Sequence, residues 1–160
     1  AAPHGPVAPA IAAFNLITSA RVSGSAFEAR NLGLLRVTDG ITMNRDRLLA
    51  DAKRKALDLV PGYSAPERPK IALAGLSGAP AIRNLLDSEG IAGRATAHDR
   101  VVGIALIDTL TGGVSADPLK PVGEDEITAM EKRAFIALCG TPGTVARVKH
   151  MLATGKPLRN

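Results

Sequence analysis

The stretch VVGIALIDTL at 101–110 constrains the fold more than any other part of this sequence. It is apolar nearly all round, and a helix of that composition needs other elements packed against it on every side. Thr96 and Asp99, three residues apart, form a capping-box pair at its start, and Gly112-Gly113 stops it. The sequence therefore predicts a buried central helix surrounded by other helices.

Six further segments carry the apolar periodicity or the end signals of helices. Good N-cap residues are either Ser23 or Ser25, then Asn44, Ser77 and Thr141, and Gly33, Gly90 and Gly155 are placed to end helices. The expected helices cover residues 10–20, 25–33, 44–60, 77–90, 124–139 and 141–155. The last two should turn inward the stripes formed by Ile127, Met130, Ala134 and Leu138 and by Val145, Val148 and Leu152.

Two short apolar runs are candidates for strands. Leu34 to Val37 is too short for a helix, and Ile71 to Leu76 opens the segment after a proline-rich connection at 61–69. The predicted fold is mainly α, a bundle-like helical array with one or two short strands. Residues 1–9, with three prolines and a glycine, should be a flexible lead-in to a single helical domain over residues 10–160.

Composition argues against several classes of protein. The chain is 46% hydrophobic but has no apolar run long enough to cross a bilayer. Its formal net charge of +5 attracts polyanions, yet the basic residues are scattered among acids. Aromatic residues make up 2% of the chain, too few to stack on bases, so we expect no nucleic-acid partner.

The sequence shows no constellation for catalysis or metal binding. His4, His98 and His150 have no metal-ligand spacing, and His98 does not face its neighbour Asp99 on a helix. The stretch GLSGA at 75–79 lacks the second glycine of a nucleophile elbow. We therefore assign no catalytic residue and no metal ligand, and we interpret Asp99 as a capping residue.

Cys139 is the only cysteine in the chain. One cysteine cannot form an intrachain disulfide or a thiolate metal cluster, which fits a reducing cytoplasm. The residue ends an apolar helix beside Gly140, with no neighbour in sequence that would activate its thiol. We predict a buried cysteine with a structural role.

Several stretches resemble known proteins. Ala-x-Glu-Ala at 26–29, followed by Gly33-Leu34, resembles the late segment of the crotonase (enoyl-CoA hydratase) family. The resemblance implies a crotonase-like late segment over residues 23–60 and a helical C-terminal extension over residues 70–160. Longer stretches are similar to the C-terminal part of bacterial β-oxidation proteins that join a 3-hydroxyacyl-CoA dehydrogenase to an enoyl-CoA hydratase. They are EARNLGLLRVTDGITMNRDRLLADAK at 28–53, HDRVVGIALIDTLTGG at 98–113, EKRAFIALCGTPGTVARVKHML at 131–152 and HMLATGKPLRN at 150–160.

The resemblance implies a cytoplasmic parent enzyme of fatty-acid metabolism that uses NAD and acts on acyl-CoA thioesters. In that family the nucleotide fold and the hydratase groups precede the segment seen here. The piece should then be structural, inactive alone and without a tightly bound cofactor. Its partners would be the remainder of the parent chain and, through exposed apolar surface, further copies of itself.

Because the resemblance implies an acyl-CoA substrate, the role of three consecutive basic residues has two interpretations. They are Lys53, Arg54 and Lys55. On a charged helix they are ordinarily a solvated face, with Asp51 and Asp58 on either side. The functional alternative is contact with the phosphates of coenzyme A. The alternative for the whole chain is a stand-alone helical interaction or regulatory module, which would have a closed, monomeric core.

Overall fold

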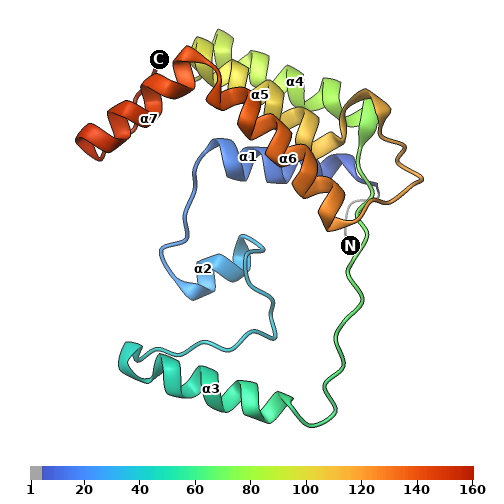
Figure 1. Cartoon of the computed structure of the whole chain (residues 1–160), viewed down its shortest axis with the longest axis vertical. Helices are drawn as coiled ribbons and strands as arrows, with labels where there is room; N and C mark the ends of the chain where they lie inside the picture. The colour runs from blue at the N-terminus through green and yellow to red at the C-terminus, as the bar shows by residue number, and fades with distance from the viewer. Residues whose placement is uncertain (1–4) are drawn as a thin grey trace. The chain divides into compact units, whose positions relative to one another are not determined.

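The computed structural model describes residues 5–160 and is mainly helical, which confirms the predicted fold class (Figure 1). His4 lies outside the described residues, as does the first part of the expected lead-in. The α-helices are α1 (Val7–Thr18), α2 (Ala26–Asn31), α3 (Leu48–Leu59), α4 (Gly75–Ile91), α5 (Ala97–Thr111), α6 (Glu124–Cys139) and α7 (Pro142–Thr154). Two 3₁₀ turns, η1 (Arg45–Arg47) and η2 (Gly113–Ser115), complete the elements.

The chain packs as two compact units. One comprises residues through Ala20 together with Arg68–Asn160, and the other is Arg21–Glu67. We expected one helical domain over 10–160 after a lead-in over 1–9. In the structure α1 already begins at Val7, so the end of that lead-in is helical.

The core of the first unit lies where α1, α4 and α5 meet, and α5 also packs against α6. Ile82 of α4 and Ile107 of α5 are fully buried, which confirms the prediction of a buried central helix. A fully buried side chain of this size stabilises the fold by about 1.5–3 kcal/mol. Gly103 allows the close approach of α4 to α5, because a Cβ there would lie 2.7 Å from Leu86 Cδ2.

Both ends of α5 follow the sequence signals. Thr96 Oγ1 accepts a hydrogen bond from the Asp99 N–H, and the Asp99 carboxylate accepts one from the Thr96 N–H. Gly112 ends the helix with a left-handed φ of 75°. The capping box and the glycine stop are therefore confirmed.

One expected strand is a turn instead. Residues Leu34 to Val37 form no ladder, because the Asp39 carboxylate accepts a hydrogen bond from the Arg36 N–H at 2.8 Å and closes the segment on itself. Arg30 also donates to the Asp39 carbonyl. The second candidate strand reduces to one antiparallel bridge between Ile71 and Val122, the single bridge in the described part of the chain.

The start of α4 also differs from the prediction. The helix begins at Gly75 rather than after Ser77, and the Ser77 hydroxyl donates to the Ala74 carbonyl at 2.7 Å instead of accepting from a helix N–H. Gly75 has a φ of +54°, and a Cβ on it would lie 2.6 Å from the Ala116 carbonyl oxygen. The tight turn at Gly75 therefore starts the helix two residues early.

The second unit contains α2, η1 and α3. Ser25 caps α2 by accepting from the Glu28 N–H at 3.1 Å, which confirms it as one of the two predicted cap candidates. Asn44 accepts from the Asp46 N–H at 2.9 Å and so caps the 3₁₀ turn η1, whereas α3 begins later, at Leu48, without the side-chain cap expected from Asn44. Gly33 takes the left-handed conformation, with φ +76°, just after α2. No residue of α3 is buried, although its apolar positions repeat at helical spacing.

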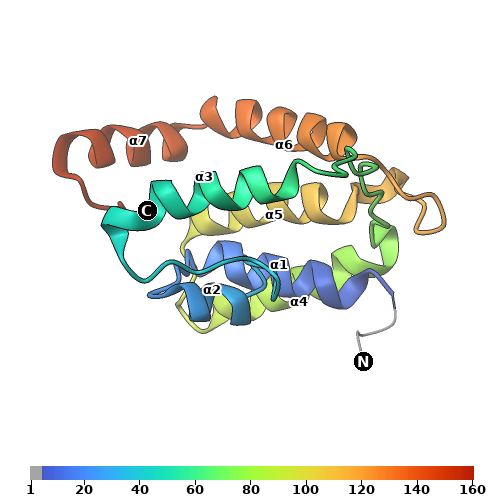
Figure 2. The ribbon, with the colours of Figure 1, turned by 90° about the horizontal axis from the view of Figure 1, so that it is seen from below.

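The helices α6 and α7 follow one another along one side of the first unit (Figure 2). The predicted inner stripe of α6 is half-buried, whereas that of α7 becomes more exposed along the helix. Val145, Val148 and Leu152 are 38%, 51% and 83% exposed, because only the first turns of α7 and the chain end contact the bundle. Cys139 is exposed rather than buried, since it lies off the inner stripe of α6.

Candidate functional site

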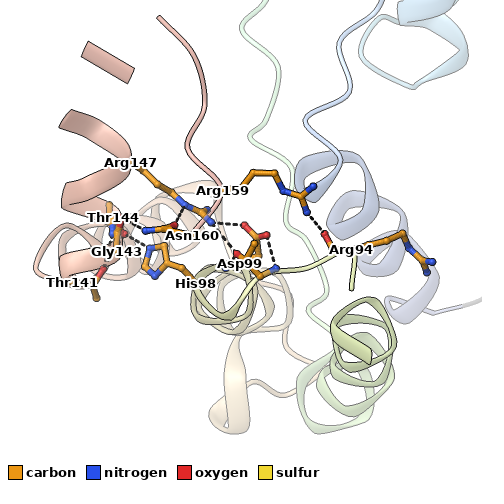
Figure 3. Close-up of polar contacts among 10 residues, drawn as sticks. Arg94, His98, Asp99, Thr141, Gly143, Thr144, Arg147, Arg159 and Asn160 are labelled. Carbon is orange, nitrogen blue, oxygen red and sulfur yellow. Dashed lines mark hydrogen bonds and ion pairs between the residues drawn. The ribbon is translucent and has the colours of Figure 1, made fainter. Parts of the chain in front are cut away.

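The densest group of polar contacts in the first unit lies where α7 and the last residues of the chain meet the start of α5 (Figure 3). The hydrogen bonds there join residues from three separate segments. We call this group the α5 clasp; its members are Thr96, His98, Asp99, Thr141, Gly143, Thr144, Arg147 and Asn160.

Arg147 of α7 is the centre of the clasp. Its Nη2 donates to Asp99 Oδ1 at 2.6 Å and to Thr96 Oγ1 at 3.3 Å, so it contacts both members of the α5 capping box. Its Nε donates to Asn160 Oδ1 at 2.7 Å. One side chain thus ties the start of α5 to α7 and to the end of the chain.

These contacts change the pKa of the Asp99 carboxyl group. Partial burial alone would raise its pKa, but hydrogen bonds from the Thr96 N–H and from Arg147, together with the Arg147 charge, outweigh burial. The pKa of Asp99 therefore lies below its ordinary value. These contacts thus favour the ionised carboxylate and its bond to Arg147.

His98 is the buried member of the clasp, with 9% of its surface exposed. Its Nε2 lies 2.9 Å from Thr144 Oγ1 on α7. Gly143 is required beside it, because a Cβ on that residue would lie 2.6 Å from the His98 Cγ atom. The backbone N–H of His98 donates to the Asn160 carbonyl oxygen at 3.3 Å, which satisfies one of the free donors of the α5 N-terminus.

The last residues of the chain are fastened at two further points. The Asn160 side-chain N–H donates to the Gly143 carbonyl at 3.1 Å, and Arg159 donates to the Arg94 carbonyl at 2.6 Å. The guanidinium of Arg94 itself pairs with Glu89 at 2.6 Å. The last residues of the chain are thus hydrogen-bonded both to α7 and to the connection between α4 and α5.

The geometry of the clasp holds segments together. Asp99 is engaged by Arg147 and Thr96, and His98 is held by Thr144. The capping role predicted for Asp99 is confirmed. Sequence reasoning missed Arg147, Gly143 and Asn160, since Arg147 and its carboxylate partner are 48 residues apart and nothing local marks the pair.

The three basic residues proposed for coenzyme A contacts lie on α3 in the second unit. Lys53, Arg54 and Lys55 are all exposed, and Arg54 donates to Asp51 at 2.7 Å. Successive helix residues are turned by about 100°, so Lys53 and Lys55 point to nearly opposite sides of α3. A single phosphate cannot contact both lysines.

Residues 5–160 bring together no group of three or more His, Cys, Asp or Glu side chains able to hold a metal ion. None of the helices among them is both long and apolar enough to span a bilayer.

The fold and the clasp together define a mainly α segment whose conspicuous polar site is structural. Over 158 residues the chain is 35% identical to a probable 3-hydroxyacyl-CoA dehydrogenase of Bacillus subtilis (strain 168). The match covers 98% of this chain but 20% of that protein, so the chain spans about a fifth of the length of the curated relative it matches. No protein-family model and no solved structure matches the chain. The expected similarity to a 3-hydroxyacyl-CoA dehydrogenase is thereby confirmed.

Proposed function

We propose that this chain is the C-terminal structural segment of a longer, cytoplasmic β-oxidation enzyme that oxidises 3-hydroxyacyl-CoA thioesters with NAD. The observation that carries the proposal is the 35% identity along 98% of the chain to a dehydrogenase about five times its length. The described residues include a clasp suited to holding helices in place. In this proposal NAD and acyl-CoA bind chiefly to the rest of the parent chain.

The exposed apolar side chains support a segment of a larger protein over a stand-alone module. A stand-alone module would close its core, yet α3 leaves Leu48, Leu49 and Leu57 exposed by 54%, 83% and 60%. A soluble monomer rarely leaves such a stripe uncovered. We propose that the remainder of the parent chain is the partner that covers α3.

The finer proposal adds an enoyl-CoA hydratase, a lyase of the crotonase family, to the parent enzyme. Its support is the motif at 26–34 and the order of α2, a glycine-ended turn and α3. The expected strand between the helices is absent from these described residues. The hydratase proposal therefore rests on the order of the helices and on the sequence motif. The two activities are therefore tested separately.

The test uses the full reading frame that contains these 160 residues. The purified parent should reduce NAD with a 3-hydroxyacyl-CoA, measured by NADH absorbance, and should hydrate an enoyl-CoA, measured by loss of the conjugated thioester absorbance. Absence of the first activity would overturn the dehydrogenase proposal, and absence of the second alone would remove only the hydratase. A reading frame that starts immediately before Ala1 would favour the stand-alone module.

For Lys53 and Lys55 on α3 we propose a contact with coenzyme A. Because they point to opposite sides of α3, we propose that one of the two contacts a phosphate. In the parent enzyme, Lys53→Gln and Lys55→Gln should then differ, one raising the KM for the acyl-CoA and the other leaving it unchanged. Arg54→Gln is the matched control, since its guanidinium already pairs with Asp51. Equal behaviour of all three variants would assign these residues to a solvated face.

A further inference from the structure

A groove of about 680 Å³ runs between α5 and α6, two helices that pack side by side in the first unit (Figure 1). The two helices supply its walls with the same residue spacing, i, i+3, i+4 and i+7, so each wall is one continuous face of its helix. We call this hollow the α5–α6 groove. Its walls include Val101, Ile104, Ala105 and Asp108 on α5, and Met130, Arg133, Ala134 and Ala137 on α6.

The groove has the dimensions of a site for another helix. Its lining on α5 extends from Val101 to Gly112. At a rise of about 1.5 Å per residue this wall is about 17 Å long, which leaves room for about three helical turns. Most of the side chains that line it are apolar. An amphipathic helix that lies in such a groove removes apolar surface of both partners from water.

The two walls carry charges of opposite sign. Asp108 on α5 and Arg133 on α6 are both exposed. Neither has a charged residue one helical turn away on its own helix, where a neighbour of opposite sign would pair with it. Glu131 and Lys132 precede Arg133 but do not line the groove, because successive helix residues are turned by about 100°. The groove therefore presents one negative and one positive wall to its partner.

The concave shape of the groove argues against the same groove of a second copy as its partner. A two-fold pair of copies places the same surface on both sides of the interface. Two grooves that face each other would bring their rims together and leave their apolar floors uncovered. The groove needs a convex partner instead. A large source of such surface is the longer protein, because the match covers 20% of the relative and leaves most of its length without a counterpart in this chain.

We propose that a helix from the part of the parent protein outside these 160 residues lies in the α5–α6 groove. Its apolar side faces Ile104 and Ala134, a basic residue on one flank pairs with Asp108, and an acidic residue on the other pairs with Arg133. This inference rests on the longer parent protein of the proposed function, but it does not depend on the activity of that protein.

The first experiment measures how fast a thiol in the groove reacts with a maleimide. Ala137→Cys in a Cys139→Ser background places a thiol on the exposed α6 wall, and Lys132→Cys in the same background is the matched control outside the groove. Mass spectrometry follows the labelled peptide in the purified parent and in the 160-residue chain. The groove thiol should react at least about tenfold more slowly in the parent, because labelling then requires local opening. The control thiol should react equally fast in both.

Several outcomes would overturn the proposal. Equal rates for the groove thiol in the parent and in the 160-residue chain would show that the groove is open. Slow labelling of the 160-residue chain that becomes faster on dilution would assign the groove to a second copy, and slow labelling at every concentration would assign it to the chain itself. Equal slowing of the control thiol in the parent would show that α6 is covered without preference for the groove.

The labelling readout is independent of the dehydrogenase assay, since it uses no substrate. Fast labelling of a parent that oxidises 3-hydroxyacyl-CoA would overturn the groove proposal alone. Slow labelling of a parent without that activity would support the groove proposal and overturn only the dehydrogenase.

The second experiment tests the charged walls. Asp108→Lys and Arg133→Glu should each raise the labelling rate of the groove thiol in the parent, relative to the rate in the 160-residue chain with the same substitution, by up to about fivefold, the range of an exposed ion pair. The ratio removes any direct effect of the changed charge on the thiol. Lys132→Glu, outside the groove, is the matched control and should leave the ratio unchanged. An unchanged ratio for both wall variants would overturn the assignment of a helix with one charge of each sign.

Discussion

The helices α5 and α3 show how similar sequence signals lead to different burial. A polar cap precedes both helices, Thr96 at the start of α5 and Asn44 at the η1 turn before α3, and both carry apolar side chains at helical spacing. α5 contacts α1, α4 and α6 and buries Ile107 completely. α3 buries none of its residues.

Whether a segment forms a helix and whether other elements bury that helix therefore have different causes. Apolar periodicity decides which side of α3 is apolar, and it acts within a few residues. Covering that side needs a second surface. α5 has one because α4 approaches it closely at Gly103, whereas the described residues of the second unit offer α3 no equivalent.

The sharpest test of this contrast removes an equal amount of apolar volume from each helix. Ile107→Ala should lower the free energy of unfolding by about 2–5 kcal/mol, because it leaves a cavity in a fully buried site. Leu49→Ala on α3 should change it by less than about 0.5 kcal/mol. Urea titrations followed by circular dichroism measure both. A similar loss for Leu49→Ala would show that α3 is covered in solution.

A smaller effect is expected in the α5 clasp. Gly143→Ala places a Cβ against the His98 ring and should cost about 1–3 kcal/mol. Gly90→Ala in α4 is the matched control, because nothing lies within 4 Å of the added Cβ. That change should stabilise the chain by up to about 1 kcal/mol through helix propensity. Thermal unfolding should therefore show shifts of opposite sign.

The bond between Arg147 and Asp99 should contribute less, since both side chains are partly exposed to solvent. A double-mutant cycle with Arg147→Leu and Asp99→Asn should give a coupling of about 1 kcal/mol. Because the folded pKa of Asp99 is lowered, this contribution is complete above its unfolded value of about 3.9. It is lost as the pH falls through the lower folded pKa.

The pH dependence separates charge from packing. The stability difference between the unmodified chain and Arg147→Leu should shrink when Asp99 is protonated at low pH. It should stay constant in the Asp99→Asn background. A difference that does not change with pH in the unmodified chain would assign the role of Arg147 to packing alone.

The last comparison concerns the caps of the two units, with effects of about 1 kcal/mol or less. Thr96→Ala should cost about 1 kcal/mol of global stability, since Thr96 caps α5 and also accepts from Arg147. Ser25→Ala removes the cap of α2, which belongs to the other unit. Its cost should appear as faster hydrogen exchange in α2 with little change in the unfolding midpoint. Equal losses of global stability would show that the two units unfold together.

Much of the local structure could be predicted because its causes are local. Thr96 with Asp99, Thr141 before Pro142, and Gly112 and Gly155 at helix ends act within one turn of backbone, and each is found where its sequence signal placed it. The predictions that were wrong required knowledge of neighbours. The run from Leu34 to Val37 found no partner strand, and Cys139 lies off the buried side of α6.

By itself the sequence determined a mainly helical chain, the caps of its helices and the buried character of α5, because hydrogen-bonding geometry and apolar periodicity are properties of short segments. The tertiary structure alone decided that Arg147 reaches Asp99 and Asn160, that Gly143 must leave room for His98, and that the apolar stripe of α7 is exposed towards its C-terminal end. Those contacts join residues far apart in the chain, and only packing determines which of them meet.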